Sequence, residues 1–323
     1  FPFIGFWKAW QLSRFKNYDA IWSMMANYAG FAALFFKLVY SKVFFVLTLQ
    51  EGDPIEYIKK RVRYVYPLFV RIFTKADFVQ TISHYLADFA RSMGYTGPLE
   101  VIPNGVDTKK FQSTITEFEL NTLKQKLNIK DGEKIIITTS RLVKKNAVDD
   151  VIRAFKFLPN NVKFIILGIG PDEEALKELA TQEGVANRMI FLGYVALGEI
   201  PKYLKISDVF IRPSLSEGMG SSFIEAMAAD VPIIATPVGG IPDFLRDPST
   251  PSTGSGQGGR GQATGLFCEV GNSRDIAEKI KILLEDTNLR DRIISNASKL
   301  VNAEYDWNLI ARKMKEEVFN KIL

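Results

Sequence analysis

The sequence RPSLSEGMGSSFIEAMA at residues 212–228 decides the fold class of this chain. An apolar run of strand length, 209–212, leads into it, a glycine-containing loop follows, and small polar residues from Ser221 suit the N-terminus of a helix. This order of strand, loop and helix makes one βα unit. Open α/β folds bind ligands at the carboxyl ends of such strands. The stretch therefore predicts a parallel sheet and a ligand site at its edge.

The loop and helix start in this stretch form a predicted anion site. Backbone N–H groups at a helix N-terminus hold phosphate oxygens, and the loop glycines remove side-chain obstruction. Glu217 lies in the loop and Glu225 in the first turns of the helix, so both carboxylates can accept hydrogen bonds from ribose or sugar hydroxyls. Without this context, two glutamates at such a spacing would be ordinary structural residues. The residues expected to bind the ligand are Glu217, Gly218, Met219, Gly220, Ser221, Ser222 and Glu225.

A group of cations follows an earlier predicted strand, 134–139. Arg141, Lys144 and Lys145 come directly after it and would face the same edge of the sheet. A departing diphosphate needs its negative charge neutralised, and the sequence has no Asp-x-Asp motif to hold a divalent metal for that task. We expect Arg141 and Lys145 to act in catalysis, with no metal or other cofactor. A solvated loop is the alternative for these cations.

Two further strand ends are expected to touch a nucleotide. Gly168 and Gly170 follow a buried strand and allow close backbone approach to a ligand. The absence of a third glycine argues against the dinucleotide fingerprint of NAD-binding proteins. Leu192 and Tyr194 end another predicted strand at the same edge, and we expect them to flank the base.

Strand-length apolar runs alternate with helix-period segments along the chain, which indicates an α/β protein with parallel sheets. The predicted strands fall into two sets, 20–24, 43–48, 78–82 and 99–102 in the first, and 134–139, 163–167, 189–192, 209–212, 232–235 and 265–270 in the second. Two Rossmann-like domains are therefore predicted, at 1–112 and 113–305. Turn-rich sequence at 103–107 and a charged helical stretch separate them.

Two irregularities interrupt this pattern. The first set lacks the innermost strand with which such a parallel sheet normally begins, so we expect the first domain to be incomplete at its N-terminus. The stretch 247–262 is rich in Ser, Thr, Gly and Pro and has no apolar residue to anchor it. We predict that it is a flexible surface insertion.

The composition is that of a globular protein with large buried cores: 323 residues, 47% hydrophobic and 12% aromatic. Cys268 is the single cysteine, so an internal disulfide is excluded, no zinc-binding spacing exists, and a reducing cytosol fits best. The most apolar stretch, 24–36, is shorter than the roughly 20 residues needed to cross a bilayer. A net charge of +5 without an aromatic-interleaved basic motif gives no reason to expect a nucleic-acid partner.

The stretch 57–75 is basic and amphipathic, with six basic residues and no acidic one. Its periodicity predicts a helix that bends near Pro67. Two interpretations remain open: a helix packed on the core with a solvated cationic face, or a surface for anionic lipid.

Taken together, these motifs resemble glycosyltransferase family 4, a family of retaining enzymes with the GT-B fold. The resemblance rests on AD (76–77) with IS (82–83), VIPNGVD (101–107), SRL (140–142), FLG (191–193), PS (213–214) with Glu217 and Glu225, Pro232, PVGGIP (237–242) and TGL (264–266). It implies two Rossmann-like domains facing across a cleft. It also implies that Glu225 holds the donor ribose, Glu217 contacts the transferred sugar, and Arg141 with a nearby lysine binds the diphosphate. A final helix, within 306–323, would complete the first domain.

The chain departs from the family pattern at several positions. The family's lysine-glycine pair aligns with Asn146-Ala147, which would shift the phosphate lysine to Lys145. The family often has a histidine after a Thr-x pair in the first domain, where this chain has Gln50. The only histidine, His84, lies at a predicted helix start and is expected to be structural.

The resemblance implies transfer of a hexose, with retention, from a UDP- or GDP-sugar to a lipid-linked or glycan acceptor in cell-envelope polysaccharide or glycolipid synthesis. We expect the protein in the cytoplasm or peripherally on the inner face of the membrane. One alternative is a sugar-nucleotide epimerase of the same fold, which would need a histidine near the sugar. The other is a truncated chain that binds nucleotide sugar without turnover.

Overall fold

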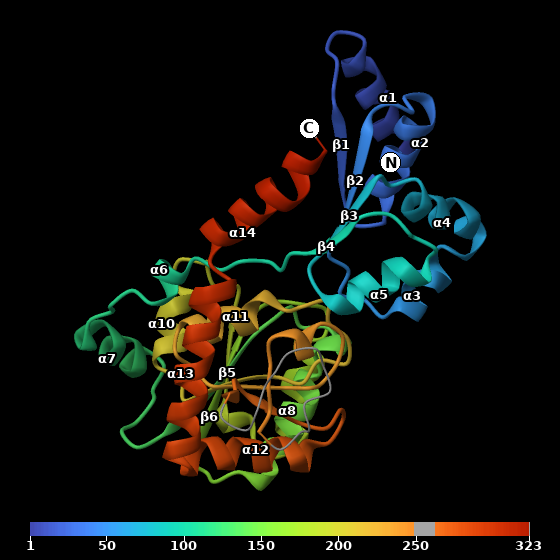
Figure 1. Ribbon diagram of the computed structural model, residues 1–323. Coiled ribbons are helices and arrows are strands. Elements are labelled where there is room, and N and C mark those ends of the chain that lie inside the picture. The colour runs from blue at the N-terminus through green and yellow to red at the C-terminus, as the bar shows by residue number, and fades with distance from the viewer. Residues whose placement is uncertain (249–261, 323) are drawn as a thin grey trace. The chain divides into compact units, whose positions relative to one another are not determined.

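The computed structural model describes residues 1–248 and 262–322, which form two compact units (Figure 1). The first unit comprises Phe1–Asn104, Glu217–Met219 and the segment from Asn308 onward; the second comprises Gly105–Ser216 and Gly220–Trp307. The division after Asn104 lies earlier in the chain than the predicted boundary at 112/113. Of the predicted ligand residues, Glu217, Gly218 and Met219 are grouped with the first unit.

Four parallel strands form the sheet of the first unit, in the order β1-β2-β3-β4, as the alternation of apolar runs predicted. They are β1 (Ala20–Met24), β2 (Phe44–Leu49), β3 (Phe78–Thr81) and β4 (Leu99–Val101). Strand β2 is buried on both faces from Phe45 to Leu49. This pattern is typical of a parallel sheet that is covered on both sides.

Helices connect these strands, and side-chain caps define the starts of two of them. The helices are α1 (Pro2–Ser13), α2 (Tyr28–Val39), α3 (Ile55–Arg61), α4 (Tyr66–Thr74) and α5 (His84–Ser92). Before α2, Asn27 Oδ1 accepts a hydrogen bond from Ala29 N at 3.1 Å. Before α5, Ser83 Oγ accepts one from Leu86 N at 3.4 Å, so His84 occupies the first position of a capped helix, as expected from its place after Ser83.

The basic stretch 57–75 forms two helices rather than the single bent helix that the sequence predicts. Helix α3 ends at Arg61, a 3₁₀ turn η1 (Arg63–Val65) follows, and α4 starts at Tyr66. Pro67 lies in the first turn of α4, where its missing N–H leaves no helical hydrogen bond unmade. Phe69, Ile72 and Phe73 are buried, whereas the cations Lys60, Arg61, Arg63, Arg71 and Lys75 are exposed.

The C-terminal segment packs against the sheet of the first unit. It continues from α14 (Trp307–Lys313) into a π-helical turn, η7 (Met314–Val318), and a 3₁₀ turn, η8 (Phe319–Lys321). Ile310 and Val318 join Val46, Phe78 and Ile102 in one buried apolar cluster. Lys321 adds an ion pair with Glu100 at 2.9 Å.

Six parallel strands form the sheet of the second unit, in the order β10-β9-β8-β5-β6-β7. They are β5 (Lys134–Thr139), β6 (Val162–Leu167), β7 (Met189–Gly193), β8 (Val209–Arg212), β9 (Ile233–Ala235) and β10 (Leu266–Phe267). The order reverses at β5, which lies between β6 and β8. Such a switch point opens a crevice at the carboxyl ends of the central strands, where ligands bind in open α/β sheets.

The helices of the second unit connect these strands and surround one large apolar core. They are α6 (Thr108–Phe111), α7 (Glu117–Lys126), α8 (Val148–Ala154), α9 (Glu173–Gln182), α10 (Ile200–Lys205), α11 (Ser221–Ala228), α12 (Ser273–Glu285) and α13 (Thr287–Glu304), labelled in part in Figure 1. The charged helix expected before the second set of strands corresponds to α7. A capping box fixes its start, with Thr116 and Glu119 bonded to each other's backbone N–H groups.

The predicted insertion, 247–262, falls mostly on residues 249–261, which lie outside the described part of the chain. At its start, the Asp247 carboxylate accepts a hydrogen bond from Phe267 N at 2.5 Å, next to β10. Among the described residues, none of the helices combines the length and apolar character that crossing a bilayer requires.

Candidate functional site

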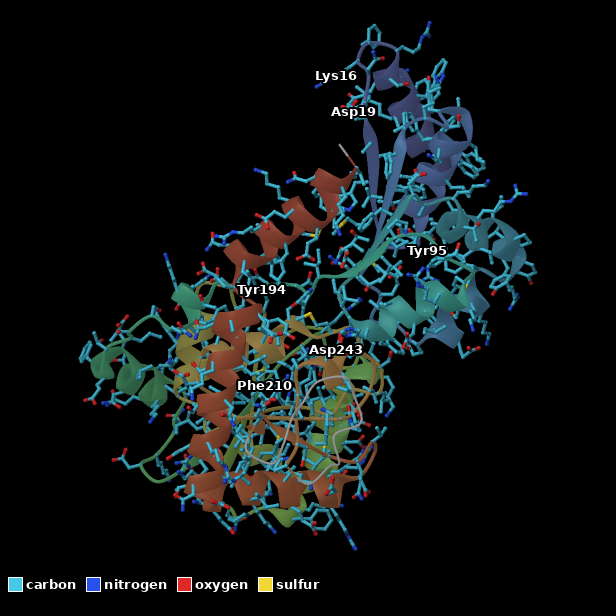
Figure 2. All side chains as sticks on the ribbon, in the orientation of Figure 1. Lys16, Asp19, Tyr95, Tyr194, Phe210 and Asp243 are labelled. Carbon is cyan, nitrogen blue, oxygen red and sulfur yellow. The ribbon has the colours of Figure 1, made fainter. Side chains whose placement is uncertain are left out.

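A cavity of about 920 Å³ lies at the carboxyl edge of the second unit's sheet. Its lining comes from the ends of β5, β6 and β8, the segment after β7, and the starts of α9, α10 and α11. Tyr194, labelled in Figure 2, is 76% exposed where the chain leaves β7. The remaining lining residues are Thr139, Ser140, Arg141, Leu167, Gly168, Ile169, Gly170, Pro171, Glu173, Val195, Leu197, Ile200, Arg212, Ser222 and Glu225.

Two glycines shape the cavity by letting two loops touch. A Cβ at Gly168 would lie 1.8 Å from the carbonyl oxygen of Ser140, and one at Gly170 would lie 2.0 Å from that of Leu142. Gly168 also has φ +136°, which side chains rarely adopt. The sequence suggested close backbone approach to a nucleotide at these glycines. The structure shows a close approach to the neighbouring loop, which brings Ser140 and Arg141 to the cavity wall.

Helix α11 starts at Ser221, as predicted, but no side chain caps it. Gly220 is the N-cap residue, with φ +87°. Ser222 Oγ instead accepts a hydrogen bond from Arg212 Nη1 at 2.8 Å. No side-chain acceptor therefore caps the N-terminus of this helix, where backbone N–H groups can hold an anion.

Arg212 is the buried cation of the cavity wall. Arg212 is the last residue of strand β8 and is 7% exposed. The guanidinium carbon lies 4.5 Å from the centroid of the Phe223 ring, and Nη1 lies 3.5 Å from the Thr139 carbonyl oxygen. Because Phe223 and Ser222 belong to α11, the arginine joins the end of β8 to the first turn of that helix.

Glu225 lies one turn further along α11 and supplies a carboxylate to the lining. Burial raises the pKa of its carboxyl group, and the positive charges of Arg212 and Lys110 oppose that rise. A half-buried carboxylate among cations is suited to accept hydrogen bonds from ligand hydroxyls.

The cations after β5 are placed in different ways. Arg141 is exposed and lines the cavity, and its carbonyl oxygen accepts a hydrogen bond from the buried Asn146 side chain at 2.6 Å. Lys144 forms an ion pair with Asp149 at 2.7 Å. Lys145 belongs to the 3₁₀ turn η2 (Lys144–Asn146), and its carbonyl oxygen accepts a hydrogen bond from Leu215 N at 2.7 Å.

Some of the residues predicted to bind the ligand line the cavity, together with residues that the sequence did not predict. Arg141, Gly168, Gly170, Tyr194, Ser222 and Glu225 line it, whereas Lys145, Leu192, Gly220 and Ser221 belong to the same unit without lining it. The polar lining residues that the sequence did not assign to the site are Thr139, Ser140, Glu173 and Arg212. Their only signal in the sequence is their position, at or just after a strand end for Thr139, Ser140 and Arg212 and at a helix start for Glu173. Ser140 Oγ is buried with no hydrogen-bond partner among the described residues.

Within residues 1–248 and 262–322, no three His, Cys, Asp or Glu side chains gather in a way that could hold a metal ion. The cavity itself combines two carboxylates, from Glu173 and Glu225, with two guanidinium groups, from Arg141 and Arg212. Its guanidinium groups can bind a ligand phosphate, and its carboxylates can accept hydrogen bonds from hydroxyls.

Fold and cavity together define a protein with two parallel α/β units, one of which carries a cavity lined by arginine and glutamate side chains at its switch point. The chain belongs to the glycosyl transferases group 1 family, whose model matches residues 120–300. Residues 1–110 match the model of Glycosyltransferase Family 4. The sequence resemblance to family 4 is thereby confirmed.

Two curated relatives share 30% of the aligned residues with this chain. An uncharacterized glycosyltransferase of Methanocaldococcus jannaschii is 30% identical over 67% of this chain and 52% of its own length. The GDP-mannose-dependent alpha-(1-6)-phosphatidylinositol monomannoside mannosyltransferase of Mycobacterium tuberculosis is 30% identical over 76% of this chain and 62% of its own length. The chain thus spans roughly half to three-fifths of the length of these relatives.

Solved structures confirm the fold prediction. Anabaena HepE in complex with UDP superposes with a TM-score of 0.83 at 21% identity, over 98% of this chain and 82% of that one. Sucrose-phosphate synthase from Thermosynechococcus elongatus gives a TM-score of 0.81 at 19% identity, over 98% and 76%. Both likenesses concern the fold alone.

Proposed function

We propose that the protein is a retaining glycosyltransferase that moves a hexose from a UDP- or GDP-sugar to a lipid-linked or glycan acceptor. The observation that carries the proposal is the cavity of the second unit, where Arg141, Glu225 and the start of α11 meet. Relatives named as GDP-mannose-dependent mannosyltransferases, and HepE structures named as complexes with UDP and UDP-glucose, support this donor class. An alpha-monoglucosyldiacylglycerol synthase of Acholeplasma laidlawii, 35% identical over 43% of this chain, supports a lipid acceptor.

In the proposed reaction the protein positions the donor and stabilises charge. Glu225 accepts hydrogen bonds from the ribose hydroxyls, and Arg141 balances the negative charge that develops on the diphosphate as its bond to the sugar breaks. Glu217 lies beside the sugar ring. The acceptor oxygen attacks from the face that the diphosphate leaves, and a phosphate oxygen takes the acceptor proton, which gives retention without a protein nucleophile.

Two further properties belong to this proposal. No metal is required, because guanidinium groups supply the positive charge that a divalent ion would otherwise bring. The protein acts in the cytoplasm or on the inner face of the membrane, in synthesis of glycolipids or envelope polysaccharide. The exposed cations of α3 and α4 support contact with anionic lipid.

A donor panel tests the proposal. The chain is incubated with UDP- and GDP-hexoses and with diacylglycerol, phosphatidylinositol and oligosaccharide acceptors, with and without EDTA, and products are identified by mass spectrometry and anomeric NMR. An α-linked product from an α-linked donor, formed equally with EDTA, is expected. An inverted product contradicts retention, and loss of product on chelation contradicts metal independence. Conversion of the donor sugar into its epimer supports the epimerase alternative, and donor binding without any product supports the binding protein.

A further inference from the structure

Two guanidinium groups line the cavity, yet the sequence singled out only one of them. Arg141 follows β5, and Arg212 ends β8. These strands pair directly, with Ile137 opposite Phe210, and two residues further along each strand lie Thr139 and Arg212. The 3.5 Å separation of Arg212 Nη1 from the Thr139 carbonyl oxygen agrees with this register. The two arginines therefore leave adjacent strands at the same edge of the sheet.

The surroundings of Arg212 fix the direction of its side chain. Ser222 Oγ holds Nη1 at 2.8 Å, and the Phe223 ring supports the guanidinium plane at 4.5 Å. Gly220 makes room for the other terminal nitrogen, because a Cβ there would lie 2.6 Å from Arg212 Nη2. A guanidinium held on both sides in this way loses little freedom when it binds an anion, and its planar set of donors matches phosphate oxygens.

Burial increases the effect of this charge. Arg212 is 7% exposed, and a cation removed from water interacts more strongly with an anion than one on the surface does. It shares the cavity lining with Ser222 and Glu225 of α11, and Ser222 accepts its hydrogen bond, so a phosphate and a hydroxyl of one ligand can meet the arginine and the carboxylate together. Lys145, by contrast, does not line the cavity.

We propose that Arg212 contacts the diphosphate of the donor and, with Arg141, forms the cation pair of the site, in the place that the sequence gave to Lys145. The inference rests on the proposed function, because it presumes that a nucleoside diphosphate occupies the cavity. Arg212 is then a donor-binding and catalytic residue whose charge grows in importance as the diphosphate departs.

The test measures affinity along two series, uridine, UMP and UDP, and guanosine, GMP and GDP, by competition and calorimetry. The span is the ratio of the diphosphate's affinity to the nucleoside's. Arg212→Gln is expected to shrink the span by about tenfold to hundredfold, the effect of a charged hydrogen bond. Arg212→Lys, which keeps the charge but not the planar fork, should recover part of it.

Arg188→Gln is the matched control. Arg188 is also buried, also lies over a phenylalanine ring, at 5.2 Å from Phe155, and also donates to backbone carbonyls, but it does not line the cavity. It should lose stability and keep the wild-type span. A folded Arg212→Gln with an unchanged span, or with equal losses for nucleoside and diphosphate, overturns the inference alone. A wild-type chain that binds nucleoside and diphosphate equally overturns the proposed function as well.

Discussion

Individual glycines set the shape of the cavity, because two loops touch where they lack a side chain. Gly168→Ala would place a methyl group 1.8 Å from the Ser140 carbonyl oxygen, so the loops must separate. A displacement of about 1 Å in a substrate-positioning loop lowers turnover by roughly a hundredfold. Rates of sugar transfer should show this loss. In Gly198→Ala, the new Cβ meets no atom within 4 Å, and the rate should stay within about twofold; equal rates in the two variants would contradict the loop-contact argument.

The carboxyl group of Glu225 should make stability depend on pH. Burial raises its folded pKa above 4.5, so the folded state holds the proton over a pH range in which the unfolded state has lost it. Its contribution is therefore fully present below pH 4.5 and declines as pH rises through the folded pKa. Glu225→Gln, which cannot ionise, should gain stability relative to the wild type between acidic and neutral pH. Urea unfolding at several pH values measures this, and a constant difference would show that Glu225 is not the group responsible.

The two candidate glutamates should differ in kinetics. Glu225 is assigned to the ribose, which stays bound throughout, so Glu225→Gln should raise the donor KM more than it lowers kcat. Glu217 is assigned to the sugar that becomes positively charged, so Glu217→Gln should lower kcat by about a hundredfold with a smaller change in donor affinity. Initial rates and calorimetry decide the matter. Parallel losses in both parameters for both variants would refute the division of roles.

At the scale of elements, the stretch of α3, η1 and α4 combines buried apolar side chains with exposed cations. Phe69, Ile72 and Phe73 fix α4 to the core, which leaves the cations outside. The stretch therefore packs on the core and presents a cationic face, as the first interpretation of the sequence predicts. Whether that face meets lipid is a separate question, because solvated cations and lipid-bound cations have the same folded structure.

Vesicle co-sedimentation addresses this question. Neutralising the exposed Lys60, Arg61 and Arg63 to Gln should weaken binding to anionic vesicles, since each cation near such a surface contributes about 1 kcal/mol. The matched control removes three exposed lysines of the second unit, Lys109, Lys126 and Lys130. Equal losses would indicate a general charge effect, and wild-type binding that is indifferent to salt and lipid charge would argue against membrane docking by this stretch.

At the scale of the whole molecule, the chain returns to the first unit after it completes the second. Ile310 is buried beside Val46 and Ile102, although more than two hundred residues of sequence separate them. The stability of the first sheet thus depends on the last segment of the chain. Ile310→Ala should lower the free energy of unfolding by about 2–5 kcal/mol.

Ile282, on α12, provides the control, because it is 39% exposed and belongs to the second unit. Ile282→Ala should cost less than about 1 kcal/mol. Thermal unfolding followed by tryptophan fluorescence reports mainly on the first unit, because Trp7, Trp10 and Trp22 belong to it. Trp22 also contacts Phe319 of the C-terminal segment edge-on at 5.2 Å. Equal shifts of Tm for both variants would contradict the role assigned to the C-terminal segment.

The sequence by itself determined the two sets of strands and the sheet edge at which the cavity lies. Apolar runs of strand length and helical periodicity are local patterns, so β1, β5 and β8 have the bounds that were predicted. Ligands of open α/β sheets bind at the carboxyl ends of the strands. The segments that follow these ends contain Arg141, Gly168 and Glu225, which line the cavity.

Only the tertiary structure decided which side chains face the cavity. Arg212 lines it because Ser222 and Phe223, ten and eleven positions later, hold the guanidinium there. The 57–75 stretch likewise forms two helices, α3 and α4, and Phe69 and Phe73 of the second helix are buried. The direction of a side chain at a strand end depends on neighbours brought near by folding. Local patterns specify elements through backbone periodicity, and they carry no information about these through-space contacts.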